Sequence, residues 1–169
     1  MKVGKLLVPL DGSPLAETAL GPALDFVAGN PDATIIVMRA AEATTLPGGD
    51  LIANEVRVVQ EAEEYLEAMA ARLTQQGAKR VKTSVWYGPA PAAIVEAIDA
   101  NKPDLIVMSS HGRGGLGRLF MGSVAESVLR ATHTPILMLR PDGAPVERPR
   151  GSAETRSRAE TTDVRGGTR

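Results

Sequence analysis

Asp104-Leu-Ile-Val-Met108, followed by Ser109-Ser-His-Gly-Arg-Gly-Gly-Leu-Gly117, is the stretch that decides how this chain is organised. The apolar run is typical of a buried strand, and it stops abruptly at a glycine-rich loop. Another glycine follows at Gly122, and Ser123 then begins an amphipathic segment that predicts a helix to about residue 132. A second apolar run covers residues 136–139. The order of strand, glycine-rich loop, helix and strand is typical of an α/β protein.

The loop has the features of an anion-binding site. Glycines tolerate positive φ and let a ligand approach the backbone closely. The N-terminus of a helix behind such a loop offers unpaired N–H groups and the positive end of the helix dipole. Because phosphate is the usual anion at such a place, nucleotide binding is the first functional hypothesis.

Strands and helices alternate along most of the chain. Patterning predicts strands at residues 5–10, 33–38, 81–87, 105–108 and 136–139. It predicts one helix from Pro14 to the Gly29 terminator, with Ser13 as N-cap, and further helices at residues 51–76, 91–100 and 123–132. The longest helix carries a single apolar stripe, formed by Ile52, Val56, Val59, Ala62, Leu66, Met69 and Leu73. Such alternation predicts a doubly wound α/β sandwich, in which a parallel sheet has helices on both faces.

Length and composition limit the class of protein. At 169 residues the chain is long enough for one domain with a substantial core and too short for us to expect two. The net charge of -1 gives no excess of positive charge for binding nucleic acid or an anionic membrane. The aromatic content of 3% offers few side chains for base stacking. The lack of cysteine excludes disulfides and thiol chemistry. No apolar run approaches the roughly 20 residues that span a bilayer, and no signal peptide is recognisable, so we expect a cytoplasmic protein.

Residues 142–169 differ from the rest of the chain in composition. They are rich in Gly, Pro, Ser, Thr and mixed charges, with Val146 and Val164 as the larger apolar residues. Such a segment buries too little apolar surface to offset the entropy of ordering it. We therefore predict a folded domain over residues 1–141 and a disordered tail over residues 142–169.

Two familiar phosphate-binding motifs are excluded. Gly112-x-Gly114-x-x-Gly117 formally matches the dinucleotide-binding fingerprint, but that fingerprint belongs to the first strand–helix turn, and its third glycine lies inside the helix. Here the match follows the fourth predicted strand, and no acidic residue ends a strand about 20 positions later. A Walker A loop is absent because the chain contains no Gly-Lys-Ser/Thr.

The spacing that remains resembles the motif Gly-x2-Gly-x9-Gly-Ser/Thr of the universal stress protein family. Gly112 is followed by nine residues and then by Gly122-Ser123, while the first glycine of the motif falls on Ser109. Val8-Pro-Leu-Asp-Gly-Ser13 and Thr134-Pro-Ile-Leu-Met-Leu-Arg140 also carry the resemblance, which extends over residues 2–140. It implies a Rossmann-like fold of the HUP type with the strand order 3-2-1-4-5.

The resemblance also implies a ligand and a site. Family members that bind ATP, in some cases with Mg or Mn, do so at matching positions, which lie where the strand order reverses and ligands of open α/β sheets bind. Asp11 would lie near adenine and ribose, Ala40 would present its backbone to adenine, and the loop and helix would hold the phosphates. The expected site residues are Pro9, Leu10, Asp11, Ala40, Met108, Ser109, Gly112, Arg113, Gly122, Ser123, Val124 and Ala125. Similar proteins are homodimers that pair through the last strand, here residues 136–139.

Several alternatives stay open at this point. Ser123-x-x-Glu126 matches a capping box, and Asp11 before Gly12 is also a common turn former. His111 and His133 have no partners at ligand spacing, so a structural or solvent role is favoured over a metal site.

For function, the alternatives to an adenine-nucleotide-binding stress-response module are a slow Mg- or Mn-dependent ATPase or phosphotransferase and a nucleotide-free dimeric protein-interaction module. Efficient catalysis is not expected, because no convincing general base is present.

Overall fold

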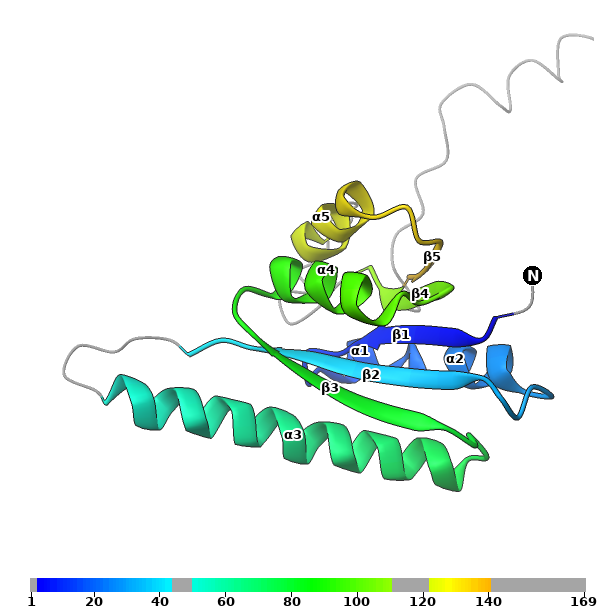
Figure 1. Ribbon diagram of the computed structural model, residues 1–169, viewed down its shortest axis with the longest axis horizontal. Coiled ribbons are helices and arrows are strands. Elements are labelled where there is room, and N and C mark those ends of the chain that lie inside the picture. The colour runs from blue at the N-terminus through cyan, green and yellow to red at the C-terminus, as the bar shows by residue number, and fades with distance from the viewer. Residues whose placement is uncertain (1–2, 44–49, 111–121, 141–169) are drawn as a thin grey trace, which may run out of the picture.

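The protein forms one parallel sheet with helices on both faces (Figure 1). The computed structural model describes residues 3–43, 50–110 and 122–140. Five strands are hydrogen-bonded in the order β3-β2-β1-β4-β5, which confirms the predicted fold class and strand order. The strands are β1 (Lys5–Pro9), β2 (Thr34–Ala41), β3 (Val81–Tyr87), β4 (Leu105–Ser109) and β5 (Ile136–Leu139).

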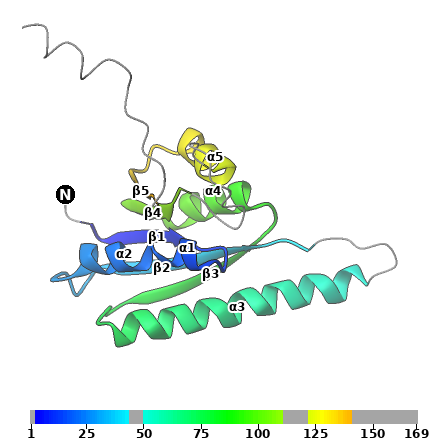
Figure 2. The same cartoon turned by 180° about the vertical axis from the view of Figure 1, so that it is seen from behind.

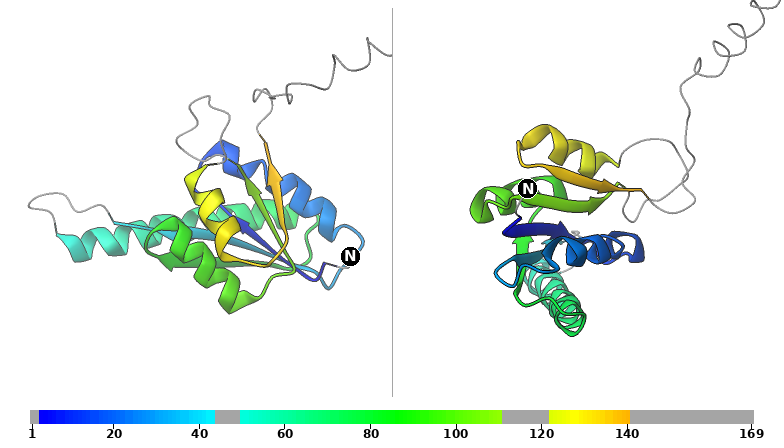
Figure 3. Two further views of the ribbon diagram at one scale, coloured as in Figure 1. Left: turned by 90° about the horizontal axis from the view of Figure 1, so that it is seen from above. Right: turned by 90° about the vertical axis from the view of Figure 1, so that its right-hand side faces the viewer.

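The helices divide between the two faces of the sheet (Figure 3). One face is covered by α1 (Pro14–Glu17), α2 (Leu20–Val27) and α3 (Leu51–Gln75), and the other by α4 (Ala90–Asn101) and α5 (Ser123–Ala131). Seen from behind, α1 and α2 lie beside β1 and β2, with α3 below them (Figure 2).

Each face of the sheet has its own core. In β1, the fully buried Leu6 and Val8 belong to the cluster with α1, α2 and α3, whereas Leu7 belongs to the cluster with α4 and α5. This alternation follows from the period of two residues in a strand, and the continuous apolar run follows from burial on both faces. β1 and β4 pair in parallel with Leu6 opposite Leu105, so their carboxyl ends lie at the same edge of the sheet.

The first helical segment differs from the prediction, because it consists of two helices instead of one. The N–H groups of Thr18 and Ala19 donate to the carbonyls three residues earlier, and the Thr18 hydroxyl donates to the Leu15 carbonyl at 2.6 Å. A hydroxyl that takes a helix carbonyl competes with the regular backbone pattern. Ser13 is the N-cap, as predicted, and accepts a hydrogen bond from the Ala16 N–H.

The second strand is longer than predicted. The sequence placed its end at Met38 and Ala40 just beyond it, but β2 continues to Ala41 because its last residues pair in register with β3, Ala41 opposite Tyr87. The predicted tail at residues 142–169 lies outside the described residues, as do Gly112, Arg113 and His111. Across the described ranges, no helix combines the length and the apolar character needed to cross a bilayer.

Candidate functional site

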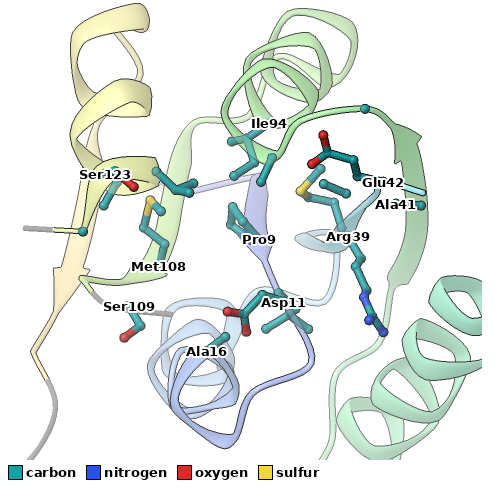
Figure 4. A pocket seen from close by; sticks show the side chains of 18 of the residues that line it. Pro9, Asp11, Ala16, Arg39, Ala41, Glu42, Ile94, Met108, Ser109 and Ser123 are labelled. Atoms are coloured by element: carbon teal, nitrogen blue, oxygen red, sulfur yellow. The ribbon is translucent and has the colours of Figure 1, made fainter. Parts of the chain in front are cut away.

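A cavity of about 750 Å³ opens at the carboxyl ends of β1, β2 and β4 (Figure 4). It lies where the strand order reverses between β1 and β4, and its volume is in the range of small-molecule pockets. Every predicted site residue that the structure describes lines it: Pro9, Leu10, Asp11, Ala40, Met108, Ser109, Gly122, Ser123, Val124 and Ala125. The remaining two, Gly112 and Arg113, are outside the described residues.

Asp11 lines the cavity and also forms the turn after β1. Its Oδ1 accepts hydrogen bonds from the Ser13 N–H at 2.9 Å and from the Ser13 hydroxyl at 2.6 Å, and Gly12 takes a φ of 83°. The turn-forming interpretation is therefore confirmed. It is compatible with a ligand contact because a carboxylate has about four acceptor positions on two oxygens.

The N–H and C=O of Ala40 point to the β1 side of β2, where the cavity lies. On the β1 side, the Leu10 N–H donates to the Met38 carbonyl at 2.8 Å, and on the β3 side the Gly88 N–H donates to the Ala41 carbonyl at 2.8 Å. The N–H and C=O of one residue point to the same side of a strand, and the side changes with each residue. Ala40 is two residues beyond Met38, so its N–H and C=O also point to the β1 side. A flat ligand edge placed there would meet a backbone donor and acceptor.

The N-terminus of α5 forms the opposite wall, and here the capping-box prediction is wrong. The N-cap is Gly122, without a side-chain cap, and Ser123 is the first helical residue. Glu126 does not reach back to a cap, because its carboxylate pairs with Arg130 at 2.6 Å. The Gly122 N–H donates to the Ser110 carbonyl at 2.7 Å, so the first-turn donors that face outward are those of Ser123, Val124 and Ala125.

Two groups of residues that line the cavity were not predicted from the sequence. Met38 and Ile94, both buried, add to Met108 an apolar wall on the α4–α5 side. Arg39, Glu42 and Glu61 add charge. Extending the period-two pattern of the second strand beyond Met38 would have placed Met38, Ala40 and residue 42 on one face. Glu61 lies on the polar face of α3, and no sequence signal distinguishes it from its exposed neighbours.

Arg39 is held at the α3 side of the cavity. Its guanidinium lies 5.0 Å from the centroid of the Tyr65 ring. The Tyr65 hydroxyl donates to Glu17 at 3.2 Å, and Arg72 pairs with the other Glu17 oxygen at 2.8 Å. Burial, and then the neighbouring Glu17 carboxylate, raise the pKa of Tyr65 above its ordinary value of 10.0. The contact is a cation–π interaction, which leaves the edge of the guanidinium available to hydrogen-bond acceptors.

The described residues give no support for a metal-binding cluster. No group of at least three His, Asp or Glu side chains lies close enough together in this part of the chain to hold an ion. His133 is exposed in the segment between α5 and β5.

Comparisons with known proteins agree with the fold. The model of the universal stress protein family matches residues 2–140. A universal stress protein of Methanocaldococcus jannaschii is 30% identical over 142 residues, covering 80% of this chain and 81% of that protein. One from Mycobacterium tuberculosis is 35% identical over 142 residues, and the match spans 45% of its length.

Solved structures share the architecture. The universal stress protein UspA of Lactobacillus plantarum superposes with a TM-score of 0.72 at 21% identity, covering 83% of this chain and 99% of that chain. A universal stress protein of Archaeoglobus fulgidus in complex with dAMP gives a TM-score of 0.60 at 21% identity, covering 82% and 98%. At this identity the likeness establishes the fold.

Proposed function

The chain belongs to the universal stress protein family, and we propose that it is a stress-response module that binds ATP or a related adenine nucleotide in the cavity between β1, β2, β4 and α5. The observation that carries the proposal is the convergence of three features on one cavity of about 750 Å³. These are the outward-facing peptide of Ala40, the apolar wall formed by Met38, Ile94 and Met108, and the N-terminal turn of α5. The dAMP carried by the Archaeoglobus fulgidus relative supports the choice of an adenine nucleotide.

The arrangement suits the parts of a nucleotide. A purine has apolar faces and a hydrogen-bonding edge, which match the methionine and isoleucine side chains and the Ala40 peptide. Phosphates suit the α5 end, where main-chain N–H groups and the helix dipole favour an anion. Asp11 is half-buried between the two walls, and in this arrangement it would accept hydrogen bonds from ribose hydroxyls.

The test uses a charge placed at the phosphate end. Ser123→Asp puts a carboxylate in the first turn of α5, where it stabilises the helix and repels phosphate. Ser123→Asn is the neutral control of similar size. We expect calorimetry with ATP to show binding to the wild type, a loss of about 100-fold for Ser123→Asp and a change of a few-fold for Ser123→Asn.

The same experiment separates the alternatives. A wild type that carries no adenine nucleotide after purification and ignores added AMP and ATP would contradict the proposal and favour the nucleotide-free interaction module. Release of phosphate from ATP in the presence of Mg²⁺ or Mn²⁺ would favour the slow ATPase. The described residues offer that reaction Asp11 as a carboxylate, although its Oδ1 already accepts two hydrogen bonds from Ser13.

Homodimerisation through β5 is part of the proposal. β5 is the outermost strand of the sheet, and all four of its residues are half-buried. The carbonyls of Pro135 and Leu139 accept hydrogen bonds from the β4 side, so the N–H of Met138 points to the other side, where the described residues supply no further strand. An unpaired apolar edge favours association with a second copy.

Met138→Pro tests this edge. Proline removes an outward N–H without removing a donor to β4, whereas Met138→Ala keeps that donor and serves as the control. We expect sedimentation equilibrium to show dimers for the wild type and for Met138→Ala, and a weakened dimer for Met138→Pro. A monomeric wild type at tens of micromolar would contradict the proposed dimer.

A further inference from the structure

Glu42 lies where β2 leaves the sheet, and its carboxylate points into the cavity (Figure 4). It follows Ala40 by two residues, so its side chain is on the same face as Ala40 and Met38, toward α4. In Figure 4 it lies beside Ile94 and on the opposite side of the cavity from Ser123. Glu42 is thus next to the place where the Ala40 peptide meets a ligand.

The other acidic residue on this rim makes a useful contrast. Glu61 of α3 also lines the cavity, but its carboxylate is paired with Arg57. Within the described ranges, Glu42 forms no such ion pair. Its two oxygens are therefore free of a competing cation from these residues.

We propose that Glu42 determines the specificity of the base by accepting a hydrogen bond from the exocyclic 6-amino group of adenine. The inference rests on the proposed function. The N–H and C=O of Ala40 complement the acceptor and donor on the pairing edge of adenine, and this uses one of the two amino protons. The second proton points past the Ala40 peptide, toward the end of β2 where Glu42 stands.

A base with a 6-oxo group is disfavoured by the same geometry. Hypoxanthine carries an oxygen acceptor where adenine has its amino donor, and a carboxylate has no proton to donate to it at neutral pH. The two sets of lone pairs would face each other. A site that accepts a hydrogen bond from an amino group disfavours an analogue without it, because the carboxylate then loses its donor and faces an acceptor instead.

The charges on the α4–α5 side of the cavity agree with this orientation, while Arg39 lies on the α3 side over the ring of Tyr65. The α5 end carries the positive end of a helix dipole, whereas Glu42 places a negative charge at the other end. An anionic nucleotide lowers its electrostatic energy by directing its phosphates to α5 and its uncharged base to Glu42. The reverse orientation would bring the phosphates against a carboxylate.

The experiment measures the ratio of the Kd for ITP to the Kd for ATP, because both ligands carry the same phosphates and only the base differs. Calorimetry is run on the wild type, Glu42→Ala, Glu42→Gln and the control Glu61→Gln. We expect the wild type to prefer ATP and Glu42→Ala to lose about tenfold of that preference, which is the low end for a hydrogen bond to a charged group on an open rim. Glu42→Gln should raise the affinity for ITP, because an amide can donate to the 6-oxo group.

The outcomes distinguish a failure of the Glu42 assignment from a failure of the proposed function. If all variants bind ATP and the ITP-to-ATP ratio is unchanged in Glu42→Ala, the assignment of Glu42 is overturned while the proposed function stands. An equal change in Glu61→Gln would also overturn it, because a general effect of negative charge would then explain the result. A wild type that binds neither nucleotide overturns both. Glu42 is exposed, so its substitutions should leave the circular dichroism spectrum unchanged.

Discussion

The two halves of α3 carry the same apolar stripe and lie in different surroundings. In the second half, Leu66 and Leu73 are 0% exposed and pack against the sheet. In the first half, Ile52 is 73% exposed and Val56 is 51% exposed. Periodicity alone therefore predicts a helix and its apolar face, but the length of the neighbouring strands decides how much of that face is covered.

The change from buried to exposed takes place at the cavity. Val58 and Glu61, near the middle of α3, line it, and Arg39 of β2 lies over the ring of Tyr65 one turn later. Beyond this point the helix continues past the main body of the sheet (Figure 1). The middle of α3 therefore serves as a wall of the candidate site, between a half that supports the fold and a half that is open to solvent.

Leu66→Ala should destabilise the packing of the second half of α3 against the sheet. The side chain is fully buried, so its removal loses apolar contacts and leaves a cavity, at a cost of about 2–5 kcal/mol in the free energy of unfolding. Urea unfolding followed by the fluorescence of Trp86, the single tryptophan of the chain, measures it. A cost below about 0.5 kcal/mol would mean that the second half of α3 is no better covered than the first.

Tyr65→Phe tests the contact between the middle of α3 and Glu17 of α1. The substitution keeps the ring under Arg39 and removes the hydroxyl that donates to Glu17, which keeps its ion pair with Arg72. We expect a loss of about 1 kcal/mol in the free energy of unfolding, the usual contribution of one hydrogen bond. A stability equal to that of the wild type would show that the link from α3 to α1 is carried by Arg72 alone.

The ionisation of Tyr65 gives a second measure of that junction. Because burial and Glu17 raise its pKa in the folded state, the folded protein keeps the phenol proton above pH 10.0, where the unfolded chain releases it. The contribution of Tyr65 to stability is therefore complete below that pH and is lost as the pH rises toward the folded-state pKa. Tyr87 is more exposed, and its hydrogen bond to Glu55 also raises its pKa.

Absorbance titration near 295 nm distinguishes the two tyrosines of the chain. In the wild type we expect one phenol to ionise well after the other, and Tyr65→Phe should remove the late step. Tyr87→Phe is the matched control and should remove the early step. Loss of the late step in Tyr87→Phe would contradict the assignment of burial to Tyr65.

The sequence predicted the parts of the site that lie in motifs, and it missed the parts that depend on packing. The expectation that Asp11, Ser109 and Ser123 border the cavity rests on local patterns, namely a turn, a strand end and a helix start, and on the resemblance to the family motif. Glu42 was missed because Arg39-Ala-Ala-Glu42 does not alternate between apolar and polar residues, so no pattern indicates that the strand continues beyond Met38 along its pairing with β3. Arg39 was missed because its contact, Tyr65, is far away in the sequence.

Ile52→Ser should have the smallest effect, and it tests the open half of α3 most directly. At 73% exposure the side chain contributes little to folding, and the helix propensities of Ile and Ser are close, so we expect a change within about 0.5 kcal/mol in urea unfolding. A loss of more than 1 kcal/mol would mean that something covers this end of the helix. If that loss grows with protein concentration, the cover is a second copy, and if it does not, it is another segment of the same chain. Either result would end the contrast between the two halves, whereas a neutral substitution leaves α3 as a helix that supports the sheet with one half and borders the cavity at its middle.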